Sequence, residues 1–433
     1  MIQKISERTM KLKYIVSILA AFIVISTAVF VALLQNQSGS DIINEDVTSD
    51  DDELTPVGGL PFHDAVNAFA FDIFREVHEG NEGNLFISPY SIFTALAMTY
   101  EGARGETADE MATVLSVEQD NESFHTYMKN LYEVLNTKNE EYNISTANAL
   151  WVKENLQLLE VYLNVIREYY GGDATEVDYS NPTEAAAIIN QWVENQTNGL
   201  IKDLITADAI NPLTALILTN AIYFKGIWKT QFDPVNTTNR TFEISAETSV
   251  ETPTMSLIDT EDVFNYAETD DIQILELPYT GNDISMIILL PKNNDLSSTI
   301  DTIDSDMLSE WTGSMVETKV NIYLPKFKVE TLYTLKNYLI ELGMNIPFIS
   351  SADFSGITGG KDLFISQVIH KAFIDVNEEG TEAAAATAVI MELTSNGGSS
   401  RIVFNCNHPF IYLIQHKQTE TILFMGSISN PLS

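Results

Sequence analysis

The sequence predicts an α+β fold in one large domain, from three observations. In the first part of the folded region, apolar residues recur at helical spacing, whereas later apolar segments are short, rich in β-branched residues and bounded by turns. The two kinds of element do not alternate strictly, which argues against a purely parallel sheet. Hydrophobic residues make up 45% of the 433 residues, so one large core can form.

The helices are expected early in the chain. Apolar residues recur at helical spacing from Phe62 to Glu79 and again within Asn84–Glu101, where Pro89 favours a first helical turn. A third amphipathic helix is expected over Glu184–Thr197, because the Asn-Gly pair that ends at Gly199 is a stop signal. Strands are expected later, at Ala215–Phe224, Ile272–Leu277, Met286–Leu290 and Val320–Leu324.

The segment Val376–Val389 allows two interpretations. Its run of alanines is compatible with an exposed helix, because alanine has the highest helix propensity. It is also suited to entering a sheet, because alternate side chains of a strand face the core. Gly380 supplies hinge freedom, and Glu382 falls on the outward set together with Ala384 and Ala386. The inward set is small and uncharged: Thr381, Ala383, Ala385, Thr387 and Val389.

Five motifs favour the strand interpretation, because together they resemble the serpin family and occur in the family's order. The resemblance covers about Pro56 to the C-terminus. It implies a serpin fold with a large central mixed sheet, smaller sheets, about nine helices and an exposed reactive-centre loop at about 378–401. The motifs are Asn84–Ile92, Leu218–Trp228, Leu324–Phe327, Phe404–Phe410 and Phe424–Ile428.

The resemblance implies a function in which the chain catalyses nothing. In serpins, a protease cuts the exposed loop, and the loop then inserts into the central sheet while the enzyme is still esterified to it. The expected partner is a serine endopeptidase, or secondly a cysteine endopeptidase, bound covalently to a monomeric inhibitor. Because no charge or proline lies on the inward face of the hinge, we expect an inhibitory member. The alternative is a non-inhibitory binding protein or chaperone.

The resemblance also implies which residues hold the sheet closed. Glu378 matches the acidic residue at the top of the strand that feeds the loop, Lys326 matches its basic partner, and Trp228 is expected beneath them. A polar cluster is expected where the strands part. It consists of Ser88, Ser91, Asn220 and His370.

The scissile bond decides which protease is trapped. The position of Glu378 in the family's pattern places the bond between Thr394 and Ser395, which suits an elastase-like or subtilisin-like enzyme. If the family's pattern is shifted by one residue, the bond lies between Leu393 and Thr394, and Leu393 suits the pocket of a chymotrypsin-like enzyme. Arg401 is a further candidate, for trypsin-like enzymes, but it lies far downstream.

Composition excludes several other functions. The chain has 61 acidic and 23 basic residues and a formal net charge of -38, which argues against nucleic acid as a partner. The spacing of the histidines does not suggest a metal site, and no cofactor is expected. Cys406 is the single cysteine, so no intrachain disulfide can form, and we expect it to be a buried packing residue.

The N-terminal residues predict a location outside the cytoplasm. Residues 1–13 are basic, and residues 14–34 are apolar and long enough to span a bilayer as an uncleaved signal anchor, or secondly to act as a cleaved signal peptide. Residues 35–55 are acidic and poor in apolar residues, as expected of an extended tether. The serpin domain, residues 56–433, would then be membrane-anchored and extracytoplasmic, or secreted.

Overall fold

The computed structural model describes residues 62–117, 122–136, 142–381 and 401–433. The contacts within the chain separate residues 1–52 from residues 53–433, and the second of these units contains every described residue. Three sheets and ten α-helices are found in the described part, so the prediction of an α+β fold is confirmed.

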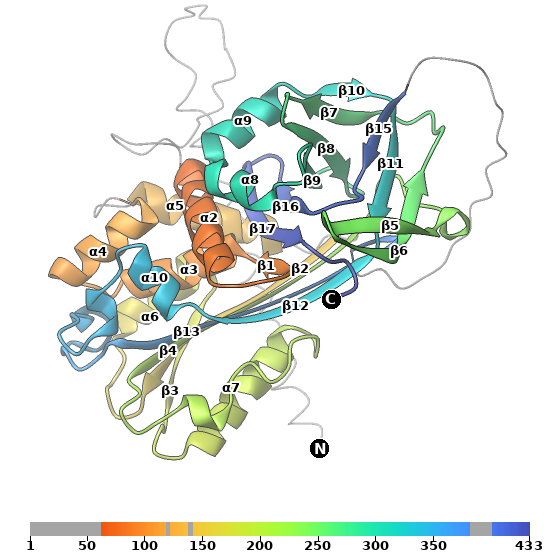
Figure 1. Ribbon diagram of the computed structural model, residues 1–433. Coiled ribbons are helices and arrows are strands. Elements are labelled where there is room, and N and C mark those ends of the chain that lie inside the picture. Colours follow the sequence, from red (N-terminus) through yellow and green to blue (C-terminus); the bar gives the residue numbers. More distant parts are fainter. Residues whose placement is uncertain (1–61, 118–121, 137–141, 382–400) are drawn as a thin grey trace, which may run out of the picture. The chain divides into compact units, whose positions relative to one another are not determined.

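The six-stranded sheet contains β14, the strand that directly precedes the segment expected to insert (Figure 1). Its edge pairs are β12 with β13 and β2 with β3, and its strands run in mixed directions. Apolar side chains fill β4 on both faces, because both faces of this sheet are covered. In spatial order the strands are β12 (Phe327–Thr334), β13 (Ile365–Val376), β14 (Gly380–Thr381), β4 (Leu216–Ile227), β2 (Tyr142–Lys153) and β3 (Asp173–Val177).

Two further sheets complete the β structure. The seven-stranded sheet is antiparallel throughout, and in spatial order it consists of β1 (Leu85–Ile87), β17 (Thr421–Ile428), β16 (Phe410–His416), β9 (Ile284–Pro291), β8 (Ile272–Pro278), β7 (Phe264–Glu268) and β10 (Val316–Thr318). The four-stranded sheet consists of β15 (Ile402–Asn405), β11 (Val320–Pro325), β6 (Thr248–Leu257) and β5 (Thr238–Ser245). The four-stranded sheet contains β15, the first strand after residues 382–400, whereas β14 of the six-stranded sheet is the last strand before them.

The central helix is α3, and all of its residues are buried. Pro89 occupies its first turn, and the Ser88 hydroxyl caps it by accepting a hydrogen bond from the Ser91 amide. The helix packs against β17 of the seven-stranded sheet and against β2 and β4 of the six-stranded sheet. Polar side chains at its start therefore lie inside the core, next to β2 and β4.

Helix α7 packs against β2 from the opposite face, so helices cover both faces of the six-stranded sheet (Figure 1). The full set of α-helices is α2 (Phe62–Glu79), α3 (Pro89–Tyr100), α4 (Gly105–Leu115), α5 (Glu122–Asn136), α6 (Glu160–Tyr170), α7 (Pro182–Gln196), α8 (Leu296–Thr302), α9 (Ser305–Gly313), α10 (Lys336–Glu341) and α11 (Ser355–Thr358). Short 3-10 turns occur at η1 (Ala207–Ala209), η2 (Pro234–Asn236) and η3 (Ile346–Phe348).

The predicted elements occur at their expected places, with differences at their ends. Helix α2 has the predicted bounds, whereas α7 begins two residues early because Pro182 occupies its first turn. Strand β4 continues to Ile227, beyond the predicted end at Phe224. Gly226 and Ile227 in this extension pair with β14.

None of the helices in the described ranges is long and apolar enough to cross a membrane. The segment expected to do so, residues 14–34, lies outside those ranges, as do the basic N-terminus and the acidic tether.

Candidate functional site: the strand-insertion site

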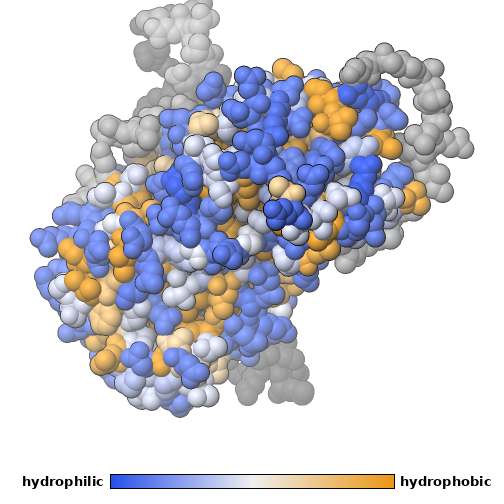
Figure 2. Space-filling view, viewed as in Figure 1, coloured by the Kyte–Doolittle hydropathy of each residue, from blue (hydrophilic) through white to orange (hydrophobic). Residues whose placement is uncertain are grey.

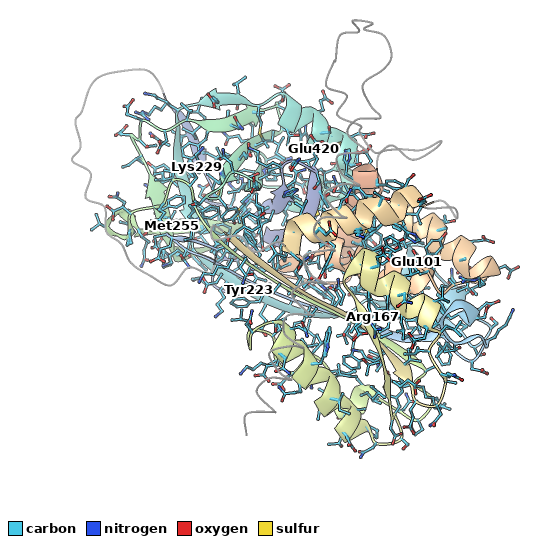
Figure 3. The ribbon with its side chains drawn as sticks, turned by 180° about the vertical axis from the view of Figure 1, so that it is seen from behind. Glu101, Arg167, Tyr223, Lys229, Met255 and Glu420 are labelled. Carbon is cyan, nitrogen blue, oxygen red and sulfur yellow. The ribbon has the colours of Figure 1, made fainter. Side chains whose placement is uncertain are left out.

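Strands β13 and β4 are parallel neighbours along most of their length and separate at one end. They pair from Ile365 opposite Leu216 to Phe373 opposite Tyr223. Beyond that point β14 lies between them and runs antiparallel to both. Gly380 and Thr381, the hinge glycine and the first residue of the predicted inward set, are therefore already a strand of this sheet. Figure 3 shows Tyr223 along this sheet, with Lys229 and Met255 toward one end and Arg167 toward the other.

Gly380 and Gly226 make this close approach possible. A Cβ atom on Gly380 would meet the carbonyl oxygen of Gly226, and its φ angle of 155° also disfavours other residues. A Cβ atom on Gly226 would lie 2.6 Å from the ring of Phe224 and 2.8 Å from the ring of Tyr279. Because both positions lack side chains, β14 can pair directly with β4.

Thr381 faces the core and is fully buried. Its hydroxyl lies 2.7 Å from the phenol oxygen of Tyr279, so the buried polar group is hydrogen-bonded. Tyr279 stacks on Trp228 with ring centroids 4.5 Å apart and an interplanar angle of 13°. The inward direction assigned to Thr381 from the sequence is thus the direction that the structure gives it.

The turn between β13 and β14 is bound through its backbone. The Trp228 amide donates to the Glu379 carbonyl over 2.9 Å, and the Trp228 indole donates to the Asn377 carbonyl over 3.0 Å. The Phe232 amide donates to the Glu378 carbonyl over 3.0 Å. Trp228 therefore packs beneath the turn and also holds it by two hydrogen bonds.

Glu378 and Lys326 form an ion pair at this end of the sheet. Lys326 Nζ lies 2.7 Å from Glu378 Oε2, and the Thr237 hydroxyl donates to Glu378 Oε1 over 2.8 Å. Burial acts to raise the pKa of Glu378, but hydrogen bonds from Lys326, the backbone and Thr237 outweigh it and lower the pKa below its ordinary value. The ionised carboxylate joins the turn after β13 to Lys326, between β11 and β12, and to Thr237, the residue after η2.

A row of polar side chains crosses the sheet deeper in the core. His370, Asn220 and Asn148 lie opposite one another on β13, β4 and β2. Asn220 donates through Nδ2 to Asn148 Oδ1 over 2.6 Å and also to the Ser91 hydroxyl, which donates to Asn148 Oδ1 over 2.9 Å. Ser88 Oγ donates to the Leu423 carbonyl over 2.6 Å. These bonds join α3 and β17 to the row.

The hydrogen bonds of His370 fix its tautomer. Its Nε2 accepts from the Ser88 amide over 3.0 Å and so carries no proton, which leaves Nδ1 to donate to Asn220 Oδ1. Burial lowers the pKa of His370 to about 3. The imidazole is therefore neutral, and its one N–H joins β13 to β4.

Several predicted site residues lie outside the described residues. These are Glu382 to Thr387 of the hinge and the candidate bonds at Leu393, Thr394 and Ser395. Arg401 is described, and its side chain is 16% exposed with its guanidinium bound to the Thr260 carbonyl and beside Asp259 and Glu261. A side chain held in this way is poorly placed to enter a protease pocket.

Three residues of the site were missed by the sequence analysis: Tyr279, Thr237 and Asn148. Tyr279 and Thr237 act through contacts with residues distant in sequence, and no local pattern marks them. Asn148 interrupts an apolar stretch of β2, which was the one available signal. Cys406 is buried, burial raises the pKa of its thiol, and both facts agree with a packing role.

Within the residues that the structure describes, no cluster of three or more His, Cys, Asp or Glu side chains could hold a metal ion.

The chain belongs to the serpin family. The family model described as "Serpin (serine protease inhibitor)" matches residues 64–431. An uncharacterized serpin-like protein of Thermococcus kodakarensis is 43% identical over 376 residues, covering 86% of each chain. The leukocyte elastase inhibitor of Xenopus tropicalis is 39% identical and is matched over 98% of its length and 85% of this chain. The crystal structure of Serpin48 from the insect Tenebrio molitor superposes with a TM-score of 0.78 at 36% identity, covering 87% of this chain and all of the other.

Proposed function

We propose that this protein is a suicide-substrate inhibitor of serine endopeptidases, acting through cleavage of its reactive-centre loop and insertion of the cut loop into the six-stranded sheet. The observation that carries the proposal is the position of β14. Thr381 is buried between β13 and β4, at the point where the two parallel strands separate. A longer strand can extend from it in the same direction, toward the row that contains His370.

The register of β14 explains the composition of the segment that follows. Thr381 lies opposite Val376 on β13 and Gly226 on β4. If the strand lengthens in this register, each inward residue meets a known pair of neighbours. Ala383 would lie between Ile374 and Phe224, Ala385 between Ala372 and Ile222, and Thr387 between His370 and Asn220. The two alanines would lie beside pairs of apolar residues, and the Thr387 hydroxyl would lie beside the one polar pair.

The chemistry follows from this geometry. The protease serine attacks the carbonyl carbon before the scissile bond, the C–N bond breaks, the new amine leaves, and the acyl group stays esterified to the enzyme. The released segment then inserts and forms hydrogen bonds on both sides, each contributing about 0.5–1.5 kcal/mol. Because the uncut loop cannot insert fully, the native sheet is metastable, and the inhibitor works once and is not itself an enzyme.

Thr394–Ser395 is the scissile bond we propose, with Leu393–Thr394 as the alternative. The first bond suits elastase-like and subtilisin-like enzymes, and the name of the Xenopus leukocyte elastase inhibitor supports an elastase-like target. We also propose that residues 14–34 anchor the protein in a membrane with the serpin domain outside. The basic residues before that segment support this orientation.

The experiment that tests the function uses the full-length protein in mild detergent. It is incubated with elastase-like, subtilisin-like, chymotrypsin-like and trypsin-like enzymes and examined on a denaturing gel and by mass of the released C-terminal peptide. An adduct that survives denaturation supports suicide inhibition, and the peptide's N-terminus gives the bond. Cleavage in the loop without any adduct would overturn the proposal and favour the non-inhibitory binding protein.

A further inference from the structure

Tyr279 reaches the six-stranded sheet from the seven-stranded sheet. It is the first residue after β8, its amide donates to the Ile284 carbonyl over 3.0 Å, and its backbone forms a single β-bridge with Trp228. Its ring stacks on Trp228 and packs edge-on against Phe224 of β4, with ring centroids 4.9 Å apart. The ring is therefore held on two sides before its hydroxyl makes any contact.

Gly226 leaves the space that the ring of Tyr279 fills. A Cβ atom at this position of β4 would crowd the ring, and a glycine within a strand often marks such a close approach. Gly226 is also the residue of β4 that pairs with Thr381. The phenol thus lies beside the residue pair through which β14 joins β4.

The hydroxyls of Tyr279 and Thr381 depend on each other. Hydrophilic residues cover much of the face seen in Figure 2, and a hydroxyl on such a surface can bond to water. Both side chains of this pair are fully buried, and their oxygens lie 2.7 Å apart. The residues opposite Thr381, Val376 and Gly226, have no polar side-chain group. Without the phenol, the Thr381 hydroxyl would have no side-chain partner at the paired positions of the flanking strands.

The phenol stays protonated and can donate. Burial raises the pKa of Tyr279 well above its ordinary value, and the bond to Thr381 offsets only part of that effect. Removal of one partner from a buried hydrogen bond costs more than the bond itself contributes, whereas replacement of both partners by apolar groups of similar shape is nearly neutral. This asymmetry allows the contact to be tested.

We propose that Tyr279 is a positioning residue that holds β14 between β13 and β4 through its hydroxyl. The consequence rests on the proposed function: the contact sets the share of attacked molecules that trap the protease. A loop whose β14 has left the sheet must first regain that position, so insertion takes longer. Water then has more time to hydrolyse the acyl-enzyme, and more inhibitor is lost as cleaved substrate.

The contact demands more of residue 381 than small size and lack of charge. Valine has nearly the shape of threonine and suits a strand, so size and charge alone permit Thr381→Val. The Tyr279 contact does not, because valine leaves the buried phenol without its partner. Tyr279→Phe removes that phenol, and the two substitutions together should therefore restore what each one impairs.

The test compares Tyr279→Phe, Thr381→Val and the double variant in the full-length protein in mild detergent. Hydrogen exchange of the Gly380 and Thr381 amides in the uncut protein, read by mass, measures how often β14 leaves the sheet. The ratio of cleaved to trapped inhibitor after reaction with an elastase-like enzyme measures the consequence. Tyr162→Phe is the matched control, because this buried hydroxyl of α6 donates to the Met98 carbonyl of α3 over 2.9 Å.

We expect each single variant to raise the exchange rate and the ratio by about fivefold or more, and the double variant to return to within about twofold of the unsubstituted protein. Tyr162→Phe should lower stability in urea without changing either readout. The inference is overturned if Thr381→Val and the double variant behave alike, or if Tyr279→Phe behaves like Tyr162→Phe. A native protein that is cut without forming an adduct lacks the proposed function, and the exchange rates alone then decide whether Tyr279 holds β14.

Discussion

His370 donates a hydrogen bond from Nδ1 to Asn220 Oδ1, and this bond joins β13 to β4 in the buried centre of the six-stranded sheet. Nε2 accepts a hydrogen bond from the Ser88 amide and therefore carries no proton, so the ring is neutral. The ring is also fully buried. A proton on Nε2 would remove that acceptor and place a charge in the core.

Acid should therefore destabilise the native protein through His370. Its folded pKa is lowered to about 3 by burial, against an ordinary value of about 6.5. Between these values the unfolded chain binds the proton more readily, so stability rises with pH and is lost as pH falls below about 6.5. In His370→Gln, the free energy of unfolding should fall less steeply with decreasing pH than in the unsubstituted protein, by up to about 1.4 kcal/mol per pH unit. Urea unfolding at pH 7, 6 and 5 measures it, and parallel curves for the two proteins would contradict it.

If the proposed function holds, Thr381→Arg should make the protein an ordinary substrate of the protease. Thr381 is buried against Tyr279, so an arginine there cannot keep β14 in the sheet and would oppose insertion after cleavage. We expect loop cleavage without a stable adduct, read on a denaturing gel. Glu382→Arg is the matched control, because the sequence places residue 382 on the outward face. Adduct formation by Thr381→Arg would rule out insertion through this residue.

Lys326→Met should weaken the closed end of the sheet. Glu378 is 11% exposed and Lys326 is 39% exposed, so solvent screens the pair only in part. Loss of the lysine leaves a carboxylate supported by Thr237 and the backbone, and we expect a loss of about 1–2 kcal/mol. Glu378→Gln and the double variant complete a mutant cycle in urea. A coupling free energy near zero would show that the two side chains do not support each other.

Thr387→Val should selectively destabilise the cleaved protein. In the register of β14, residue 387 reaches the row between His370 and Asn220 and separates these two hydrogen-bonding groups. A hydroxyl there can bond to either, whereas valine leaves His370 Nδ1 and Asn220 Oδ1 without their shared hydrogen bond, at a cost of about 1–3 kcal/mol for each buried atom. Thermal unfolding of the cut and uncut proteins measures the effect, with Thr387→Ser as the control that keeps the hydroxyl. If valine lowers the unfolding temperature of the cut and the uncut protein equally, residue 387 does not lie between His370 and Asn220 in the cut protein.

The sequence was sufficient to predict the kind of fold and the bounds of α2, because apolar spacing and capping residues are local signals. It was not sufficient to predict that β4 reaches Ile227, because that end is set by pairing with Gly380 and not by local propensity. Likewise, Asn148 joins the row only through strand register, which depends on the whole sheet. The ion pair of Lys326 and Glu378 was expected from resemblance alone, since 52 positions separate the two residues.

The pairing of Gly380 and Thr381 with β13 and β4 affects how fast the cut loop would insert. Forming the first contacts of a new strand costs chain entropy, whereas each later residue only extends an existing ladder. In this protein those first contacts exist before any bond is cut. In the proposed mechanism, insertion would therefore begin as propagation of an existing strand, without a nucleation step. Its rate, and so its competition with hydrolysis of the acyl-enzyme, depends on how readily β13 separates from β4.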